Sequence, residues 1–95
     1  MPLEDDSDEE LFRAVGARVR QLRTDRGLSQ RDFATAAGMS PGYAWRVEDG
    51  RQNLNLRTLA RIALALGTEM SDLVAGVPAT LVSQANRPYR RGESE

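Results

Sequence analysis

Two short helix patterns joined by a glycine-containing turn occupy residues 28–47 of this 95-residue sequence. Ser29 is suited to cap the first helix, and Asp32 stands three residues later, where the acid of a capping box belongs. Gly38 then supplies a residue that readily takes positive φ and ends a helix. The segment therefore predicts a short helix that stops at a tight turn.

A second short helix pattern follows this turn directly. Ser40 is the next candidate for an N-cap, and Pro41 stands at the first helical position, where proline is tolerated. The pattern runs to about Asp49, and Gly50 provides its stop. Two short helices joined by such a turn form a helix-turn-helix motif, whose second helix is free to enter the major groove of DNA.

A longer helix pattern precedes the motif, over residues 8–26. Ser7 and Glu10 have the spacing of a capping box at its start. Gly16 interrupts the pattern at a cost of about 1 kcal/mol relative to alanine, which favours a role in close helix approach. The apolar residues at helical spacing, which we expect in the core, are Leu11, Phe12, Val15, Val19 and Leu22.

Two further helix patterns follow the motif. Asn55 is suited to cap a helix that ends at Gly67, and residues 69–75 predict a shorter helix. Residues 79–84 fit either another helical turn or a short strand. The apolar residues of the two helices are Leu56, Leu59, Ala60, Ala63 and Leu66 in the first and Met70, Leu73 and Val74 in the second. The chain is therefore predicted to be all-α.

The charge of the chain is distributed unevenly, although its formal net value is only −1. Residues 1–12 hold six acids and no base, residues 13–62 hold ten arginines and four acids, and residues 63–95 hold three arginines and four acids. The basic charge therefore lies on the motif and its neighbours, where a phosphate-binding surface would be. We predict an acidic disordered segment over residues 1–7, a folded domain over 8–76 and a partly disordered extension over 77–95.

The composition excludes several kinds of site. The chain contains no cysteine and no histidine, which rules out disulfides, cysteine or histidine metal sites and histidine acid–base chemistry. No nucleophile–base pair is apparent, so we predict no catalytic residue, no metal and no cofactor. The longest apolar run, near residues 62–66, is too short for a membrane span, and the N-terminus is acidic. We expect a cytoplasmic protein that does not associate with membranes.

Five pieces of the sequence, in register, resemble the Cro/CI-type (XRE) helix-turn-helix family. The resemblance covers residues 16–74 and implies a compact five-helix, lambda-repressor-like domain that binds double-stranded DNA as a homodimer. The pieces are GARVRQLR at residues 16–23, LSQ at 28–30, ATAAG at 34–38, RVEDG at 46–50 and LRTLARIALALG at 56–67.

The resemblance also implies roles for individual residues. Gln30 would contact a phosphate, and Arg51 and its loop neighbours match positions that often touch the backbone. The groove-facing positions of the second helix would be occupied by Pro41, Gly42, Tyr43 and Arg46. Arg23 and Glu48 match positions that form a partly buried ion pair. The full set of predicted DNA-binding residues is Ser29, Gln30, Ser40, Pro41, Gly42, Tyr43, Arg46, Arg51 and Asn53.

The sequence departs from the family pattern at the second helix of the motif. Ala44 stands where a larger inward residue is usual, and Trp45 replaces a small polar residue. Trp45 either folds over the space that Ala44 leaves or is exposed for a contact, and we favour packing because large aromatics usually bury most of their surface. Pro41 and Gly42 lack polar side chains, which shifts base reading toward other residues and toward DNA shape.

The functional hypothesis from the sequence is a sequence-specific transcriptional regulator. We expect a dimeric repressor on a two-fold operator, with half-sites on the order of 34 Å apart. One alternative is an antitoxin, in which a terminal segment binds a protein partner. Another is a restriction-modification controller. The apolar residues of the last helix and the extension predict a two-fold interface, or else they only close the core of the monomer.

Overall fold

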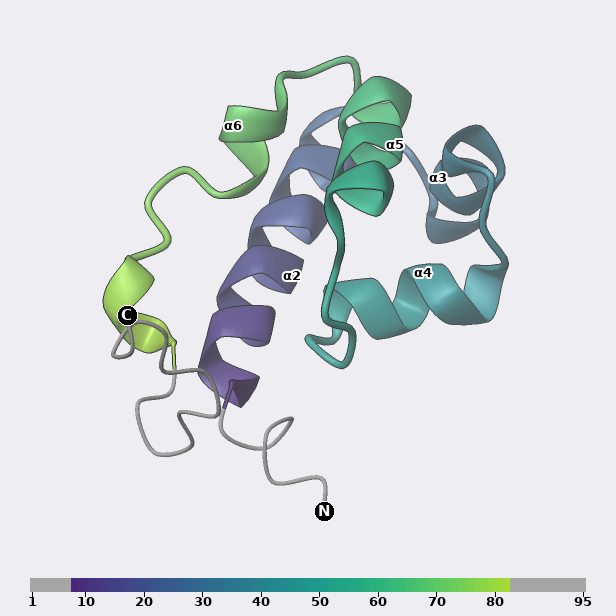
Figure 1. Ribbon diagram of the computed structural model, residues 1–95. Helices are drawn as coiled ribbons and strands as arrows, with labels where there is room; N and C mark the ends of the chain where they lie inside the picture. The colour runs from purple at the N-terminus through teal and green to yellow at the C-terminus, as the bar shows by residue number, and fades with distance from the viewer. Residues whose placement is uncertain (1–7, 83–95) are drawn as a thin grey trace.

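The computed structural model describes residues 8–82, and these residues form helices and connecting turns without a strand (Figure 1). The predicted all-α class is confirmed, and predicted helix ends differ from the observed ones by one or two residues. The predicted segment 1–7 and residues 83–95 of the predicted extension lie outside the described residues. The elements are α2 (Glu9–Asp25), α3 (Gln30–Ala37), α4 (Pro41–Glu48), α5 (Leu56–Leu66), α6 (Met70–Leu73) and the 3-10 turn η1 (Ala79–Leu81).

The predicted N-caps of α3, α4 and α5 are present. In each, a side-chain oxygen accepts a hydrogen bond from a backbone N–H three residues later, which satisfies one of the free donors at the helix start. The pairs are Ser29 with Asp32 at 3.0 Å, Ser40 with Tyr43 at 3.1 Å and Asn55 with Thr58 at 2.8 Å. Local sequence therefore defines where these three helices begin.

The starts of α2 and α6 differ from the sequence interpretation. Asp8, not Ser7, occupies the N-cap position of α2, and Ser7 lies outside the described residues. The short helix α6 has a capping box that we did not predict, formed by Glu69 and Asp72. Hydrogen bonds from the Thr68 hydroxyl and the Glu69 N–H hold the pKa of the Asp72 carboxyl below its usual value. These bonds stabilise a helix that is otherwise too short to form alone.

Helix α2 runs through the centre of the domain, with α4, α5, α6 and η1 packed against it (Figure 1). Helix α3 packs on α4 and α5 and completes the helix-turn-helix motif. Phe33, Ile62 and Leu73 are among the largest fully buried side chains. The other buried apolar residues are Val19, Leu22, Ala34, Ala37, Ala44, Val47, Ala63 and Leu66.

The predicted apolar face of α5 is wrong at its first turn. Leu56 is 74% exposed and Ala60 is also exposed, whereas Ile62 is completely buried. The reason is that residues 59, 62, 63 and 66 also have i, i+3, i+4 and i+7 spacing, and the helix turns this set toward the core. In the same way Met70 and Val74 of the last helix are exposed, and only Leu73 is buried.

Gly16 allows the close approach of α2 and α4, as its position in a helix pattern indicated. A Cβ atom at this residue would lie 2.8 Å from the carbonyl oxygen of Glu48, and the carbonyl oxygen of Val47 would be closer still. Both are backbone atoms, so neither can move aside without shifting α4 itself. The two helices pack at a separation that only glycine permits.

The carboxylate of Glu48 ties the same two helices together. Glu48 has a fully buried side chain, and Arg23 of α2 donates to it through Nε at 2.6 Å and through Nη2 at 3.0 Å. Arg20 adds a longer contact at 3.3 Å from a half-exposed side chain. Arg23 also donates to the carbonyl oxygen of Leu28 at 2.8 Å, which fixes the connection that leads into α3.

We predict that Gly16→Ala destabilises the protein, although alanine favours a helix by about 1 kcal/mol over glycine. The added methyl group must separate α2 from α4, and overpacking of this kind costs roughly 1–3 kcal/mol. Gly42→Ala is the control, because its Cβ would meet only the side chain of Arg46 at 3.8 Å. Urea denaturation measures both; a Gly16→Ala protein as stable as the control variant would contradict the packing argument.

We predict that Glu48→Ala lowers stability by roughly 3–5 kcal/mol, because it strands the largely buried charge of Arg23. Asp25→Ala is the matched control: Asp25 is an exposed acid that accepts one hydrogen bond, from Gln21 at 2.8 Å, and its loss is expected within about 0.5 kcal/mol. Thermal melts of the two variants decide the matter. Equal shifts in melting temperature would show that the ion pair contributes little.

Candidate nucleic-acid interface

The turn between α3 and α4 is built from local contacts. Gly38 adopts a left-handed conformation with φ of 72°, and the N–H of Met39 donates to the carbonyl oxygen of Ala34 at 2.9 Å. A residue with a side chain would be strained at Gly38. The turn therefore reverses the chain within three residues and sets α4 across the end of α3.

Helix α4 divides into a buried face and an exposed face. Ala44, Val47 and Glu48 are buried, and Ala44 is completely inaccessible to solvent. Gly42, on the opposite side, is exposed. Because the buried residues are spaced i, i+3 and i+4, they hold one side of the helix against the domain and leave the other side free.

Trp45 lies on the exposed side of α4, and our prediction that it packs over Ala44 is wrong. Trp45 is 46% exposed, while Ala44 beside it is fully covered by the core. Successive residues in a helix are about 100° apart, so Trp45 points away from the inward face. The burial of Ala44 therefore does not place the indole ring in the core.

Gln30, a predicted phosphate contact, is held by the buried acid of α4. Its side-chain N–H donates to Oε1 of Glu48 at 3.0 Å, and the residue is half-buried, not a freely solvated first-turn residue. An amide nitrogen carries two hydrogens, so this contact uses only one of its donors. Glu48 therefore orients Gln30 at the N-terminal end of α3 while a second donor remains for a ligand.

Arg46 extends across the exposed face of α4. Its Nε donates to Oε1 of Gln52 at 3.2 Å, and its guanidinium carbon lies 5.6 Å from the centre of the Tyr43 ring. Tyr43 is half-buried against the core, so it presents less surface than the predicted groove-facing role suggested.

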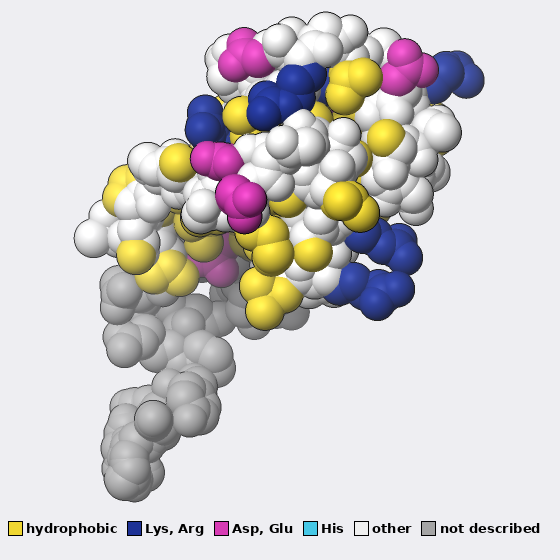
Figure 2. All heavy atoms as spheres, turned by 90° about the horizontal axis from the view of Figure 1, so that it is seen from above, with side chains coloured by type: hydrophobic (Ala, Val, Ile, Leu, Met, Phe, Trp, Pro, Cys, Tyr) yellow, Lys and Arg dark blue, Asp and Glu magenta, His cyan; other side chains and the backbone are white. Residues whose placement is uncertain are grey.

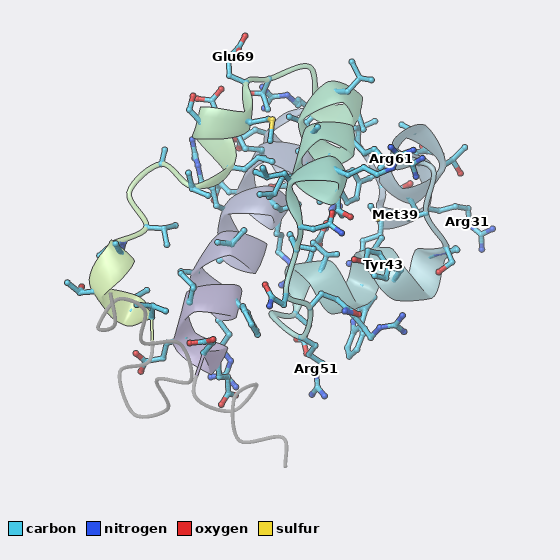
Figure 3. The ribbon with its side chains drawn as sticks, in the orientation of Figure 1. Arg31, Met39, Tyr43, Arg51, Arg61 and Glu69 are labelled. Carbon is cyan, nitrogen blue, oxygen red and sulfur yellow. The ribbon has the colours of Figure 1, made fainter. Side chains whose placement is uncertain are left out.

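Arg51 projects from the loop after α4, as Figure 3 shows. It pairs with Asp49 at 2.6 Å, and its guanidinium carbon lies 5.7 Å from the centre of the Trp45 ring. Asn53, two residues further along the loop, is exposed. A groove separates this loop from the first turn of α2; it is lined by Glu9, Phe12, Arg13, Asp49, Gly50, Arg51, Gln52 and Asn53.

The remaining predicted residues lie at the two helix starts. Ser29 and Ser40 are exposed caps whose hydroxyl oxygens are already engaged by backbone N–H groups, and Pro41 is exposed at the first position of α4. The sequence interpretation missed Arg31, an exposed residue of α3 that points away from the body (Figure 3). The sequence offered one indication of this residue: Arg31 directly follows Gln30, the predicted phosphate contact at which α3 begins.

These features together make one surface. The exposed side of α4, the start of α3 and the loop after α4 carry arginines and hydrogen-bond donors, and the buried sides of the same elements form the core. Within residues 8–82, no helix is long and apolar enough to cross a membrane. A surface of this kind is suited to bind a polyanion whose groove is wide enough to admit one helix.

Comparisons with known proteins agree with this geometry. A family model described as a helix-turn-helix domain matches residues 14–75. The HTH-type transcriptional regulator DdrOP3 of Deinococcus deserti is 43% identical over 60 residues, which cover 63% of this chain and 46% of that protein. An immunity repressor protein of Bacillus phage phi105 is 33% identical over 81 residues, which cover 85% and 55%. The chain thus spans about half the length of these two relatives.

A solved structure shows the same fold over nearly its whole length. The restriction-modification controller protein C.AhdI from Aeromonas hydrophila superposes with a TM-score of 0.64 at 38% sequence identity, covering 67% of this chain and 96% of that one. The family model spans more than half of the chain, and the superposition accounts for the arrangement of its helices. This chain belongs to the helix-turn-helix family, in its Cro/CI-type (XRE) branch.

Proposed function

We propose that this protein is a cytoplasmic, sequence-specific DNA-binding transcriptional regulator, a dimeric repressor that places α4 in the major groove of a two-fold operator. The observation that carries the proposal is the division of α4 into a buried face and an exposed, arginine-bearing face. An isolated helix of eight residues would not hold a shape in water. Here the core and the Glu48 contacts hold the helix in place. Its exposed side chains are therefore already positioned before a ligand binds.

The residues of the surface divide into two roles. Gln30 and Arg51 lie at the edges, where they would bind phosphates and supply affinity without reading sequence. Arg46 extends from the centre of the exposed face and is suited to a bidentate contact with guanine. Pro41 and Gly42 offer no side-chain donors or acceptors, so Arg46 carries a large share of the direct readout.

The partners of these arginines in the free protein are easily exchanged. Arg46 interacts with the neutral side chains of Gln52 and Tyr43, and Arg51 pairs with Asp49 where both side chains are well exposed. Exposed pairs of this kind are worth about 1 kcal/mol or less. A phosphate or a guanine edge can replace them at little cost.

A restriction-modification controller is the second candidate. The observation that favours it is the superposition on C.AhdI, which this chain covers almost completely. Repression is favoured by the similarity to the phage immunity repressor. Methyltransferase and nuclease genes beside the gene for this protein would support the controller; their absence would leave the repressor.

A two-fold contact at the C-terminal side of the domain would complete the proposal. Met70, Val74 and Val82 are exposed apolar residues that follow α5 along the chain. Figure 2 shows hydrophobic side chains reaching the surface between polar ones when the molecule is seen from above. A symmetric dimer would remove such residues from water and fix the separation of two copies of α4.

Selection of bound sequences from random duplex DNA tests the function, and Arg46→Ala and Gln30→Ala test the roles. We expect a two-fold sequence with half-sites about one helical turn apart.

Arg46→Ala should weaken the best operator by roughly 1–3 kcal/mol and relax preference at one position per half-site, whereas Gln30→Ala should weaken all sequences about equally. A uniform loss for Arg46→Ala across single-base variants would make it a phosphate contact. No enrichment at all would contradict the function.

Sedimentation at micromolar concentration tests the dimer. We expect Val74→Glu to shift the protein toward monomer, because a charge buried in an apolar interface is strongly unfavourable. Leu64→Glu is the control, since Leu64 is 83% exposed but lies on α5. Dissociation by the control and not by Val74→Glu would move the interface to α5. A wild-type protein that stays monomeric at all concentrations would rule out the dimer.

A further inference from the structure

The indole of Trp45 is a large apolar surface on the helix that is proposed to enter DNA. Trp45 is 46% exposed, although aromatic side chains of this size are mostly buried in folded proteins. Exposure of an apolar ring to water is unfavourable, so covering the ring contributes favourably to the free energy of binding a partner. Because Trp45 lies on the exposed face of α4, the partner that would cover it is the groove itself.

The position of Trp45 on α4 places the ring beside the residue proposed to read bases. Gly42, Trp45 and Arg46 are spaced i, i+3 and i+4, so they share one face of the helix. Helical side chains lean toward the N-terminus and cover the preceding turn. That turn contains Gly42, which has no side chain to shield the ring. The indole and the Arg46 guanidinium therefore approach a groove together.

Arg51 holds the ring from the side of the loop. Its guanidinium lies over the indole at 5.7 Å and is itself paired with Asp49 at 2.6 Å. A cation over an aromatic face is attracted by the ring, which limits the rotamers that Trp45 samples. Trp45 thus lies between the loop after α4 and Arg46, the residue proposed to read bases.

The chemistry of the ring selects one feature of the major groove. Base edges there present donors and acceptors and a single apolar group, the C5-methyl of thymine. An indole has no hydrogen-bond acceptor and only one donor, and base edges carry no cation for its face, so the apolar methyl group is the feature of the groove that its ring suits. We propose that Trp45 reads a thymine in each half-site by contact with its C5-methyl group, an inference that rests on the proposed DNA-binding function.

Replacement of thymine by uracil tests the proposal, because uracil lacks only the methyl group. In the selected operator each thymine of one half-site is replaced in turn, and affinity is measured at fixed salt. We expect the wild-type protein to lose about fourfold at one position, as for one buried methyl group. Trp45→Ala should bind the thymine and uracil duplexes equally, and Trp45→Phe should still prefer thymine because an apolar ring suffices.

Two control variants and a melting curve keep the result interpretable. Leu64→Ala removes an exposed apolar residue of α5 and should keep both the affinity and the thymine preference. Arg46→Ala should lose affinity at its own position but keep the ratio between thymine and uracil duplexes. Thermal melts of the Trp45 variants should match the wild type, because the ring is not part of the core.

Three outcomes would overturn the proposal. These are a wild-type protein indifferent to uracil at every position, a Trp45→Ala protein that keeps the preference, and a Trp45→Phe protein that loses it, which would show that an apolar ring at this position does not suffice. Failure of the wild-type protein to bind any selected duplex would overturn the DNA-binding function as well. The two failures are therefore distinguishable.

Discussion

The arrangement of the motif depends on the buried carboxylate of Glu48. A carboxylate out of contact with water is strongly unfavourable unless donors surround it. The donors come from Arg20 and Arg23 of α2 and from Gln30 of α3. Satisfying this one charge therefore requires both helices to meet the C-terminal end of α4. Apolar contacts with Ala44 and Val47 fill the remaining space, but they have no comparable directional requirement.

The same constraint explains why α4 can present a binding face. With its inward residues fixed by the core and by Glu48, the exposed residues have a defined direction although the helix has only two turns. Gln30 takes its orientation from the acid that anchors α4, so the proposed phosphate contact and the proposed base-reading helix are positioned by one group. Weak surface contacts, such as the hydrogen bond from Arg46 to Gln52, do not involve Glu48 and can be exchanged for contacts with a ligand.

The close packing of α2 on α4 and the charge contact reinforce each other. Gly16 brings the backbones near enough for Arg23 to reach Glu48 with two nitrogens, and the bidentate contact favours that separation. The exposed residues have no such mutual constraint, which is why Trp45 and Leu56 differ from their expected positions while the buried residues mostly do not.

The sequence by itself determined the helices, the caps of α3, α4 and α5 and the turn, because these depend on groups close in the chain, such as Ser29 with Asp32 and Gly38 with its neighbours. The family motifs also predicted the ion pair between Arg23 and Glu48. Only the tertiary structure decided which side of a helix is buried. The predicted face of α5, residues 56, 59, 60, 63 and 66, and the set that faces the core, residues 59, 62, 63 and 66, both fit a helical period. The outward direction of Trp45 likewise depended on how α4 packs on the rest of the domain. Which side of a helix is buried depends on contacts between residues far apart in the chain, and the spacing of residues along the sequence gives no information about those contacts.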